Sequence, residues 1–109
     1  MKTTIQEFEN TVVVSLSGRL DRNQSLGLLS ELTRHMQTAS QLLIDVGDAE
    51  ITDSTAIAVF IGALQQARQL DISFGLIALN GNIRQMIRLF RLDRLMPAYP
   101  TIEAALNHA

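Results

Sequence analysis

The chain has 109 residues, of which 47% are hydrophobic and 18% are charged, and its formal net charge is −2. This composition indicates one folded globular domain, and the slightly acidic balance disfavours nucleic acid as a partner. The absence of cysteine excludes a disulfide scaffold, a thiolate metal site and a cysteine nucleophile.

The apolar segments give no sign of targeting to a membrane. Residues 1–7 contain no apolar core and turn acidic at once, so they do not form a signal peptide. The longest apolar run, residues 56–64, is nine residues long and too short to span a bilayer. We therefore expect a cytoplasmic protein without direct membrane insertion.

The first predicted elements are two strands. Residues 5–8 form a candidate edge strand. Residues 11–17 alternate in the manner of a strand and are rich in β-branched side chains. Gly18 is expected to end this strand and to begin a polar loop through residues 19–23.

A helix and a buried strand follow. Leucines with helical spacing predict a helix over residues 25–39, capped by Asn23 or Ser25. Residues 42–46 are almost continuously apolar, which is typical of a buried parallel strand. Residues 47–50 are expected to form the loop after it.

The second half predicts a helix over residues 54–70, a buried strand over 72–79 and a helix over 83–90. A short edge strand over 95–99 and a last helix over 101–107 complete the series. Strands that alternate with helices imply an α/β fold. We expect a single domain with a mixed sheet of four to five strands, the opening pair antiparallel, and about four helices packed on it.

Ligands of open α/β sheets bind outside the carboxyl ends of the strands. Three predicted loops meet at that edge, namely residues 18–23, 47–54 and 80–82. The topology is therefore expected to bring together one group of carboxylates and hydroxyls: Asp21, Asp48, Asp53, Ser54 and Thr55.

This group lacks the partners that catalysis requires. His35 and His108 are the only histidines, and both are expected on the surface and far from Ser54. The carboxylates of residues 45, 48, 50 and 53 do not have the spacing of a calcium loop, and no glycine-rich phosphate-binding motif follows any strand. We predict no metal, no cofactor and no enzymatic activity.

Ser54 begins the predicted second helix and has two possible roles. Serine caps helix N-termini, but Thr52, Asp53 and Thr55 could also do so. The alternative is a hydroxyl that accepts a phosphate beside the positive end of the helix dipole. The next two turns are small or apolar on almost every side, which predicts that another helix of the domain or a partner covers them: Ala56, Ala58, Val59, Gly62 and Ala63.

Four arginines gather near the third helix, at positions 84, 88, 91 and 94, with only Asp93 opposing them. They form either a solvated helix face or a docking patch for an acidic partner.

Several segments together resemble STAS domains, best known as anti-sigma factor antagonists. Residues 12–21 resemble the family's strand followed by Gly-x-Leu-Asp. Residues 43–46 and 51–57 resemble its next strand and its Asp-Ser-Ser-Gly-Leu signature. Residues 83–92 and 104–106 resemble its C-terminal portion. The likeness covers nearly the whole chain and implies one STAS-like domain over residues 1–109.

The resemblance implies a bacterial regulator of transcription that works by partner switching. Its unphosphorylated form would bind an anti-sigma factor that is also an ATP-dependent serine kinase, and phosphorylation would switch it off until a serine phosphatase resets it. Ser54 is then the phosphate acceptor, with Thr55 as second choice. The expected partner-binding residues are Asp21, Asp53, Ser54, Thr55, Ala56, Ala58, Val59 and Gly62.

The sequence departs from the signature at two positions. Thr55 replaces the second serine, and Ala56 replaces the glycine, which puts a methyl group where the partner is expected to approach. The resemblance also allows a constitutive STAS subunit of a multi-protein complex, such as a lipid-transport ATPase assembly.

Overall fold

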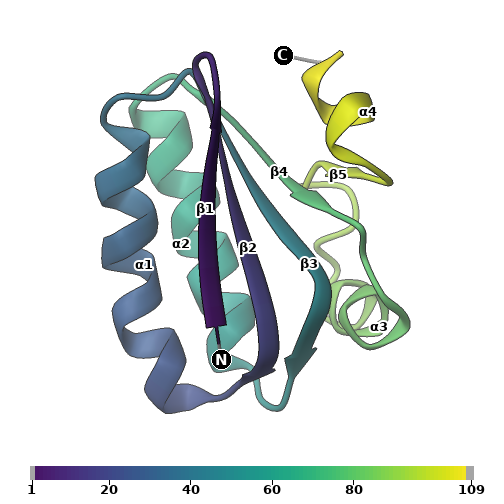
Figure 1. Ribbon diagram of the computed structural model, residues 1–109. Coiled ribbons are helices and arrows are strands. Elements are labelled where there is room, and N and C mark those ends of the chain that lie inside the picture. The colour runs from purple at the N-terminus through teal and green to yellow at the C-terminus, as the bar shows by residue number, and fades with distance from the viewer. Residues whose placement is uncertain (1, 108–109) are drawn as a thin grey trace.

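Alternating apolar side chains build the centre of a five-stranded sheet in the computed structural model, which describes residues 2–107. The strands lie in chain order, β1 antiparallel to β2 and every other pair parallel (Figure 1). This confirms the predicted mixed sheet with an antiparallel opening pair. The five strands are β1 (Lys2–Phe8), β2 (Thr11–Leu20), β3 (Gln41–Ile51), β4 (Ser73–Ile77) and β5 (Ala98–Tyr99).

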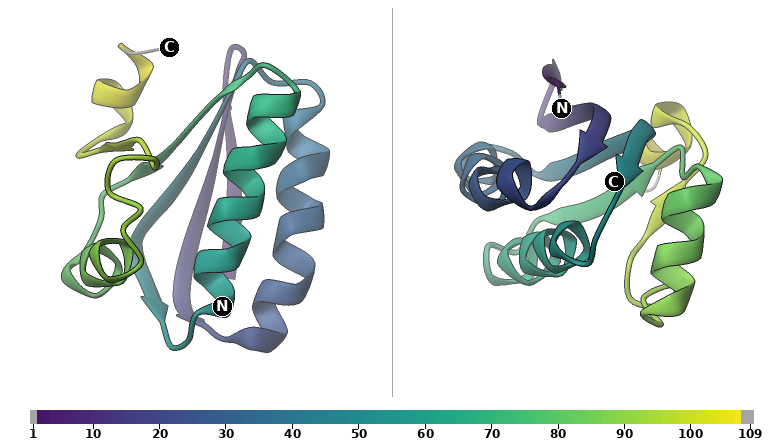
Figure 2. Two further views of the ribbon diagram at one scale, coloured as in Figure 1. Left: turned by 180° about the vertical axis from the view of Figure 1, so that it is seen from behind. Right: turned by 90° about the horizontal axis from the view of Figure 1, so that it is seen from below.

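Four helices in the described part of the chain flank the sheet: α1 (Arg22–Met36), α2 (Thr55–Gln69), α3 (Gly81–Leu89) and α4 (Ile102–Leu106). Figure 2 shows α1 and α2 side by side along one face, with α3 beyond β4. None of these helices is long and apolar enough to cross a membrane.

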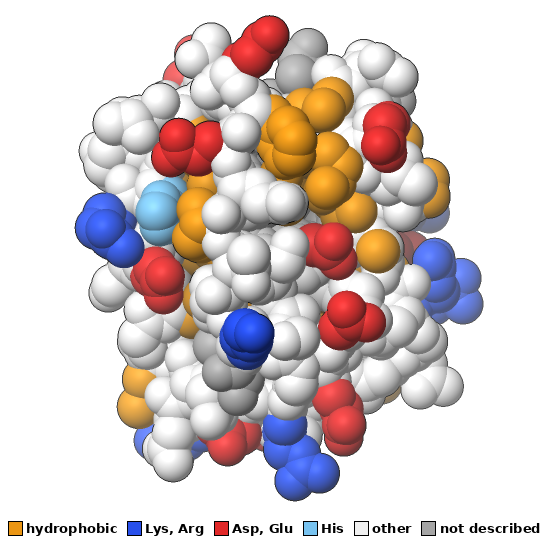
Figure 3. Space-filling view, viewed as in Figure 1, with side chains coloured by type: hydrophobic (Ala, Val, Ile, Leu, Met, Phe, Trp, Pro, Cys, Tyr) orange, Lys and Arg blue, Asp and Glu red, His pale blue; other side chains and the backbone are white. Residues whose placement is uncertain are grey.

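The period of two along each strand divides the apolar side chains between the two faces of the sheet. Val12, Val14 and Leu16 of β2 join the main core under α1 and α2, where Phe60 is fully buried. Val13 points the other way and packs in a smaller cluster with Ala105 of α4. Figure 3 shows this second face, where the exposed apolar side chains gather beside α4.

The structure corrects two predicted ends at the carboxyl edge of the sheet. Gly18 does not end β2, which continues to Leu20 after a register shift between Ser15 and Ser17. Gly18 itself adopts a positive φ of 90°. Residues 47–50 are not a loop, since they extend β3, and residues 48–50 pair with residues 17–19 of β2.

The start of α1 is also corrected. Its N-cap is Asp21, whose carboxylate accepts a hydrogen bond from the Gln24 N–H at 3.1 Å, so neither Asn23 nor Ser25 caps it. The helix therefore begins and ends three residues earlier than predicted. His35 is only half exposed, and its Nε2 is buried without a hydrogen-bond partner in the described structure. His108 lies outside the described residues.

Candidate functional site

The loop between β3 and α2 separates the two roles considered for Ser54. The Asp53 carboxylate accepts a hydrogen bond from the Thr55 N–H at 2.9 Å and so caps the helix. Ser54 occupies the N-cap position and is exposed, but within residues 2–107 its side chain makes no capping hydrogen bond. Its hydroxyl is therefore accessible at the positive end of α2.

Two of the predicted loops meet beside Ser54. Leu20 pairs with Ile51 at the end of the β2–β3 ladder, and the Thr52 hydroxyl reaches the Leu20 carbonyl at 3.5 Å. Asp21 follows directly, so its carboxylate lies on the loop next to the one that carries Ser54. This juxtaposition agrees with the sequence-based expectation for Asp21, Asp53, Ser54 and Thr55.

Asp48 does not belong to this group. It lies within β3 opposite Ser17, three strand residues before Ile51, which corresponds to roughly 10 Å along the strand. The sequence placed it in a loop because Gly47 resembles a strand end.

The apolar turns of α2 are covered by the domain itself. Ala56 and Val59 are buried in the main core. Gly62 faces Leu29 of α1, and a Cβ added at position 62 would lie 3.0 Å from a methyl carbon of Leu29. Of these predicted surface residues, Ala58 alone is exposed. The expectation of an apolar docking face through positions 56, 59 and 62 is thus corrected, because α1 and the sheet occupy that side of α2.

The burial of Ala56 changes the meaning of its departure from the family signature. Its methyl group points into the core with no exposed surface and does not obstruct an approach to Ser54. The exposed part of the site consists of Ser54 and Ala58, with Asp53 and Thr55 partly accessible.

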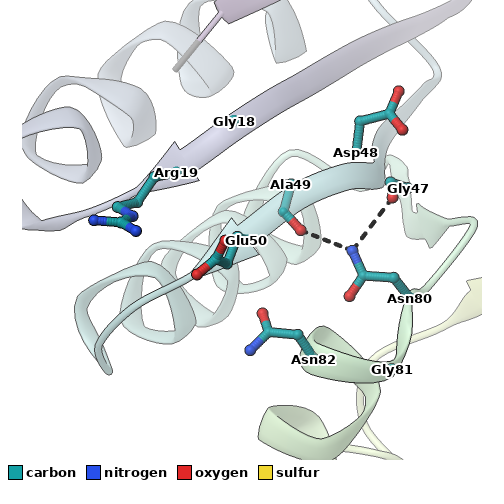
Figure 4. A pocket seen from close by; sticks show the side chains of 9 residues that line it. All are labelled: Gly18, Arg19, Gly47, Asp48, Ala49, Glu50, Asn80, Gly81 and Asn82. Carbon is teal, nitrogen blue, oxygen red and sulfur yellow. Dashed lines mark hydrogen bonds between the residues drawn. The ribbon is translucent and has the colours of Figure 1, made fainter.

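Two asparagines at the start of α3 contribute contacts that the sequence analysis missed. Asn80 caps α3 by accepting a hydrogen bond from the Ile83 N–H, and its amide donates to carbonyls of β3. Asn82 pairs with the backbone of Ile51. With the ends of β2 and β3 they line an open groove of about 560 Å³ (Figure 4). The sequence showed a turn signal here, but the partners lie about 30 residues away.

The arrangement offers a hydroxyl acceptor without catalytic partners in the described residues. His35 lies in the last turn of α1, whereas Ser54 is the N-cap of α2, and the two helices start at the same end of the sheet (Figure 1). Within residues 2–107 no group of three or more His, Asp or Glu side chains is placed to hold a metal ion. The arginines at 84, 88, 91 and 94 are all exposed, and they lie on or just after α3, away from α1 and α2 (Figure 2).

Comparisons with known proteins agree with the fold. A family model described as "Mlab, STAS domain" matches residues 3–97. A Thermotoga neapolitana protein, named as an anti-sigma factor antagonist homologue, is 27% identical over 68 residues. That match covers 62% of this chain and 60% of the relative, so the chain spans less than two thirds of the relative's length.

Solved structures show the same fold at low identity. An anti-sigma factor antagonist from Mycobacterium paratuberculosis has a TM-score of 0.87 at 23% identity, covering 98% of this chain and 92% of its own. The antagonist SpoIIAA in its unphosphorylated form has a TM-score of 0.84 at 15% identity, covering 98% and 95%. The phosphorylated form of SpoIIAA from Bacillus has a TM-score of 0.76 at 15% identity, covering 98% of both chains.

Proposed function

Since this chain belongs to the STAS domain family, we propose that it is an anti-sigma factor antagonist-like regulator controlled by phosphorylation of Ser54. In the unphosphorylated form it binds an anti-sigma factor that is also an ATP-dependent serine kinase, and the phosphorylated form does not bind. A serine phosphatase restores the first form. The protein acts in the cytoplasm by binding and has no catalytic activity of its own.

The state of the Ser54 hydroxyl carries this proposal. A serine used as a helix cap is engaged with backbone N–H groups, whereas the Ser54 side chain is exposed and makes no capping bond in the described structure. Asp53 performs that role instead. A kinase can therefore modify Ser54 without first breaking a contact that stabilises α2.

The charge of a phosphate explains how the switch would work. Phosphorylation adds about −1.5 to −2 charges at pH 7. The positive end of the α2 dipole stabilises this negative charge by about 0.3–1 kcal/mol, so we expect the domain to keep its fold when Ser54 is phosphorylated. The neighbouring carboxylates of Asp21 and Asp53 increase the local negative charge. Removing such a phosphate from water at an interface costs more than the dipole returns, and binding is lost.

Mass spectrometry after incubation with ATP and candidate serine kinases of the ATP-binding type tests the modification. We expect one phosphate on the parent protein, none on Ser54→Ala and one on Thr55→Ala, which is the matched control. A phosphate that persists in Ser54→Ala and disappears in Thr55→Ala would move the acceptor to Thr55.

Two further measurements test the switch itself. Ser54→Asp should keep the parental circular dichroism spectrum and lose binding to the kinase in a calorimetric titration. Structures of both forms should superimpose through α2, and a refolded α2 in the phosphorylated form would contradict direct blocking by charge.

A constitutive subunit of a multi-protein complex, such as a lipid-transport ATPase assembly, is the second candidate. The matching family model supports it only in that its description, "Mlab, STAS domain", names no anti-sigma factor antagonist. In that case the surface at the start of α2 docks constitutively, and Thr52 or Ser54 has a structural role. Binding of Ser54→Asp as tight as that of the parent protein would support this candidate over the switch.

A further inference from the structure

The end of β3 projects beyond its neighbour on one side. Its pairing with β4 stops at Asp45 opposite Ile77, whereas its pairing with β2 continues to Ile51. Backbone groups on the β4 side of residues 46–51 therefore have no strand to pair with. Unpaired N–H and C=O groups at such an edge are costly when water is excluded from them.

Side chains from α3 replace the missing strand. The Asn80 amide nitrogen lies 3.2 Å from the Val46 carbonyl, 3.3 Å from that of Gly47 and 2.7 Å from that of Ala49. Its oxygen accepts from the Ile83 N–H at 3.0 Å, so both ends of this side chain are engaged. Figure 4 shows Asn80 pointing from the start of α3 toward β3.

Asn82 bonds to the backbone of Ile51, the last residue of β3, in the place of a neighbouring strand. Its oxygen accepts from the Ile51 N–H at 2.8 Å, and its nitrogen donates to the Ile51 carbonyl at 3.4 Å. A neighbouring strand could satisfy the same two groups. The chain then passes directly through Thr52 and Asp53 to Ser54.

We propose that Asn82 is a positioning residue for Ser54: it holds Ile51 and thereby keeps residues 52–54 in the conformation that the kinase partner recognises. The Thr52 hydroxyl bond to Leu20 holds the same segment from the β2 side. A partner that meets an ordered segment does not have to order it on binding. The recognition step rests on the proposed function, whereas the ordering of the segment does not.

Three variants of the whole chain test the positioning. Asn82→Ala removes both bonds to Ile51, and Asn82→Asp keeps an acceptor for the Ile51 N–H. Gln85→Ala is the matched control, because it shortens an exposed amide side chain of the same helix. Loss of two hydrogen bonds predicts roughly tenfold faster amide exchange in Asn82→Ala at Ile51 and Thr55, whose N–H groups donate to Asn82 and Asp53. Asn82→Asp should recover most of the protection, and Gln85→Ala should match the parent.

Exchange rates at the centres of β2 and β4 separate positioning from general stabilisation. Unchanged exchange at Ile51 and Thr55 overturns the proposal, as does uniform acceleration across the sheet. Phosphorylation kinetics then test recognition: KM for Asn82→Ala should rise several-fold with kcat unchanged, and Asn82→Asp should restore it. Local acceleration with a parental KM also overturns the proposal. If no kinase modifies even the parent, the proposed function fails, and the exchange result alone decides whether Asn82 orders the segment.

Discussion

Asp53 bonds to the start of α2 and the Ser54 side chain does not, so the two residues should contribute differently to the free energy of unfolding. Asp53→Ala removes the acceptor that lies 2.9 Å from the Thr55 N–H. Loss of a side-chain cap costs about 1 kcal/mol, within a range of about 0.5–2 kcal/mol. For 109 residues this lowers the melting temperature by about 4 °C. Ser54→Ala removes no capping bond and should change the free energy of unfolding by less than about 0.5 kcal/mol.

Urea unfolding followed by circular dichroism measures both variants on the same scale. Asp21→Ala is the positive control, because Asp21 is the N-cap of α1 and accepts a hydrogen bond of 3.1 Å from the Gln24 N–H, so its loss should cost about 1 kcal/mol. A reversed order, in which Ser54→Ala loses about 1 kcal/mol and Asp53→Ala nothing, would mean that Ser54 is the cap. The Ser54 hydroxyl would then be engaged with the helix backbone, contrary to our interpretation.

Three other substitutions probe the fold, each measured by the same unfolding assay. Gly27→Ala should stabilise α1 by about 0.5–1 kcal/mol, because a Cβ there meets no atom within 4 Å; no gain would indicate strain in α1. Gly75→Ala should destabilise by about 1–3 kcal/mol, since its Cβ would lie 2.8 Å from the Tyr99 ring; a neutral result would mean that the ring moves freely. Gln41→Ala should cost about 1–3 kcal/mol, because the buried amide bridges β2, β3 and α4; a cost near zero would show that water replaces it.

The order of the elements could be predicted because it depends on local patterns. Alternation in β2 and the apolar run of β3 are readable within a few residues, and both strands exist where expected. The cap of α1 was also readable, since Asp21 and Gln24 have the spacing of a capping box. Asn23 and Ser25 compete with Asp21 as candidates because they lie closer to the first leucines of the helical pattern. Local signals that compete in this way shift an element's boundary and leave its type unchanged.

The carboxyl edge of the sheet could not be predicted, because it depends on contacts between distant residues. The extension of β3 through residues 47–50 follows a register shift in which β3 advances three residues, from Asp45 to Asp48, while β2 advances two. The side chains of Asn80 and Asn82 bond to the backbone of this extension. The apolar surface of α2 was ambiguous for the same reason. The sequence showed that something covers Ala56 and Val59, and only the packing of α1 and the sheet identifies what it is.

Because the residue that caps α2 is not the residue that bears the free hydroxyl, position 54 is open to evolutionary change. We expect threonine, alanine or aspartate to replace Ser54 at little cost in folding free energy, because the hydrogen bond from the Thr55 N–H to Asp53 does not involve the Ser54 side chain. Under the proposed function, a single substitution can therefore remove the phosphorylation site or fix it in a permanently charged state without passing through an unstable intermediate. Descendants of one such domain can divide into switched and constitutive forms while the sheet and its helices stay the same.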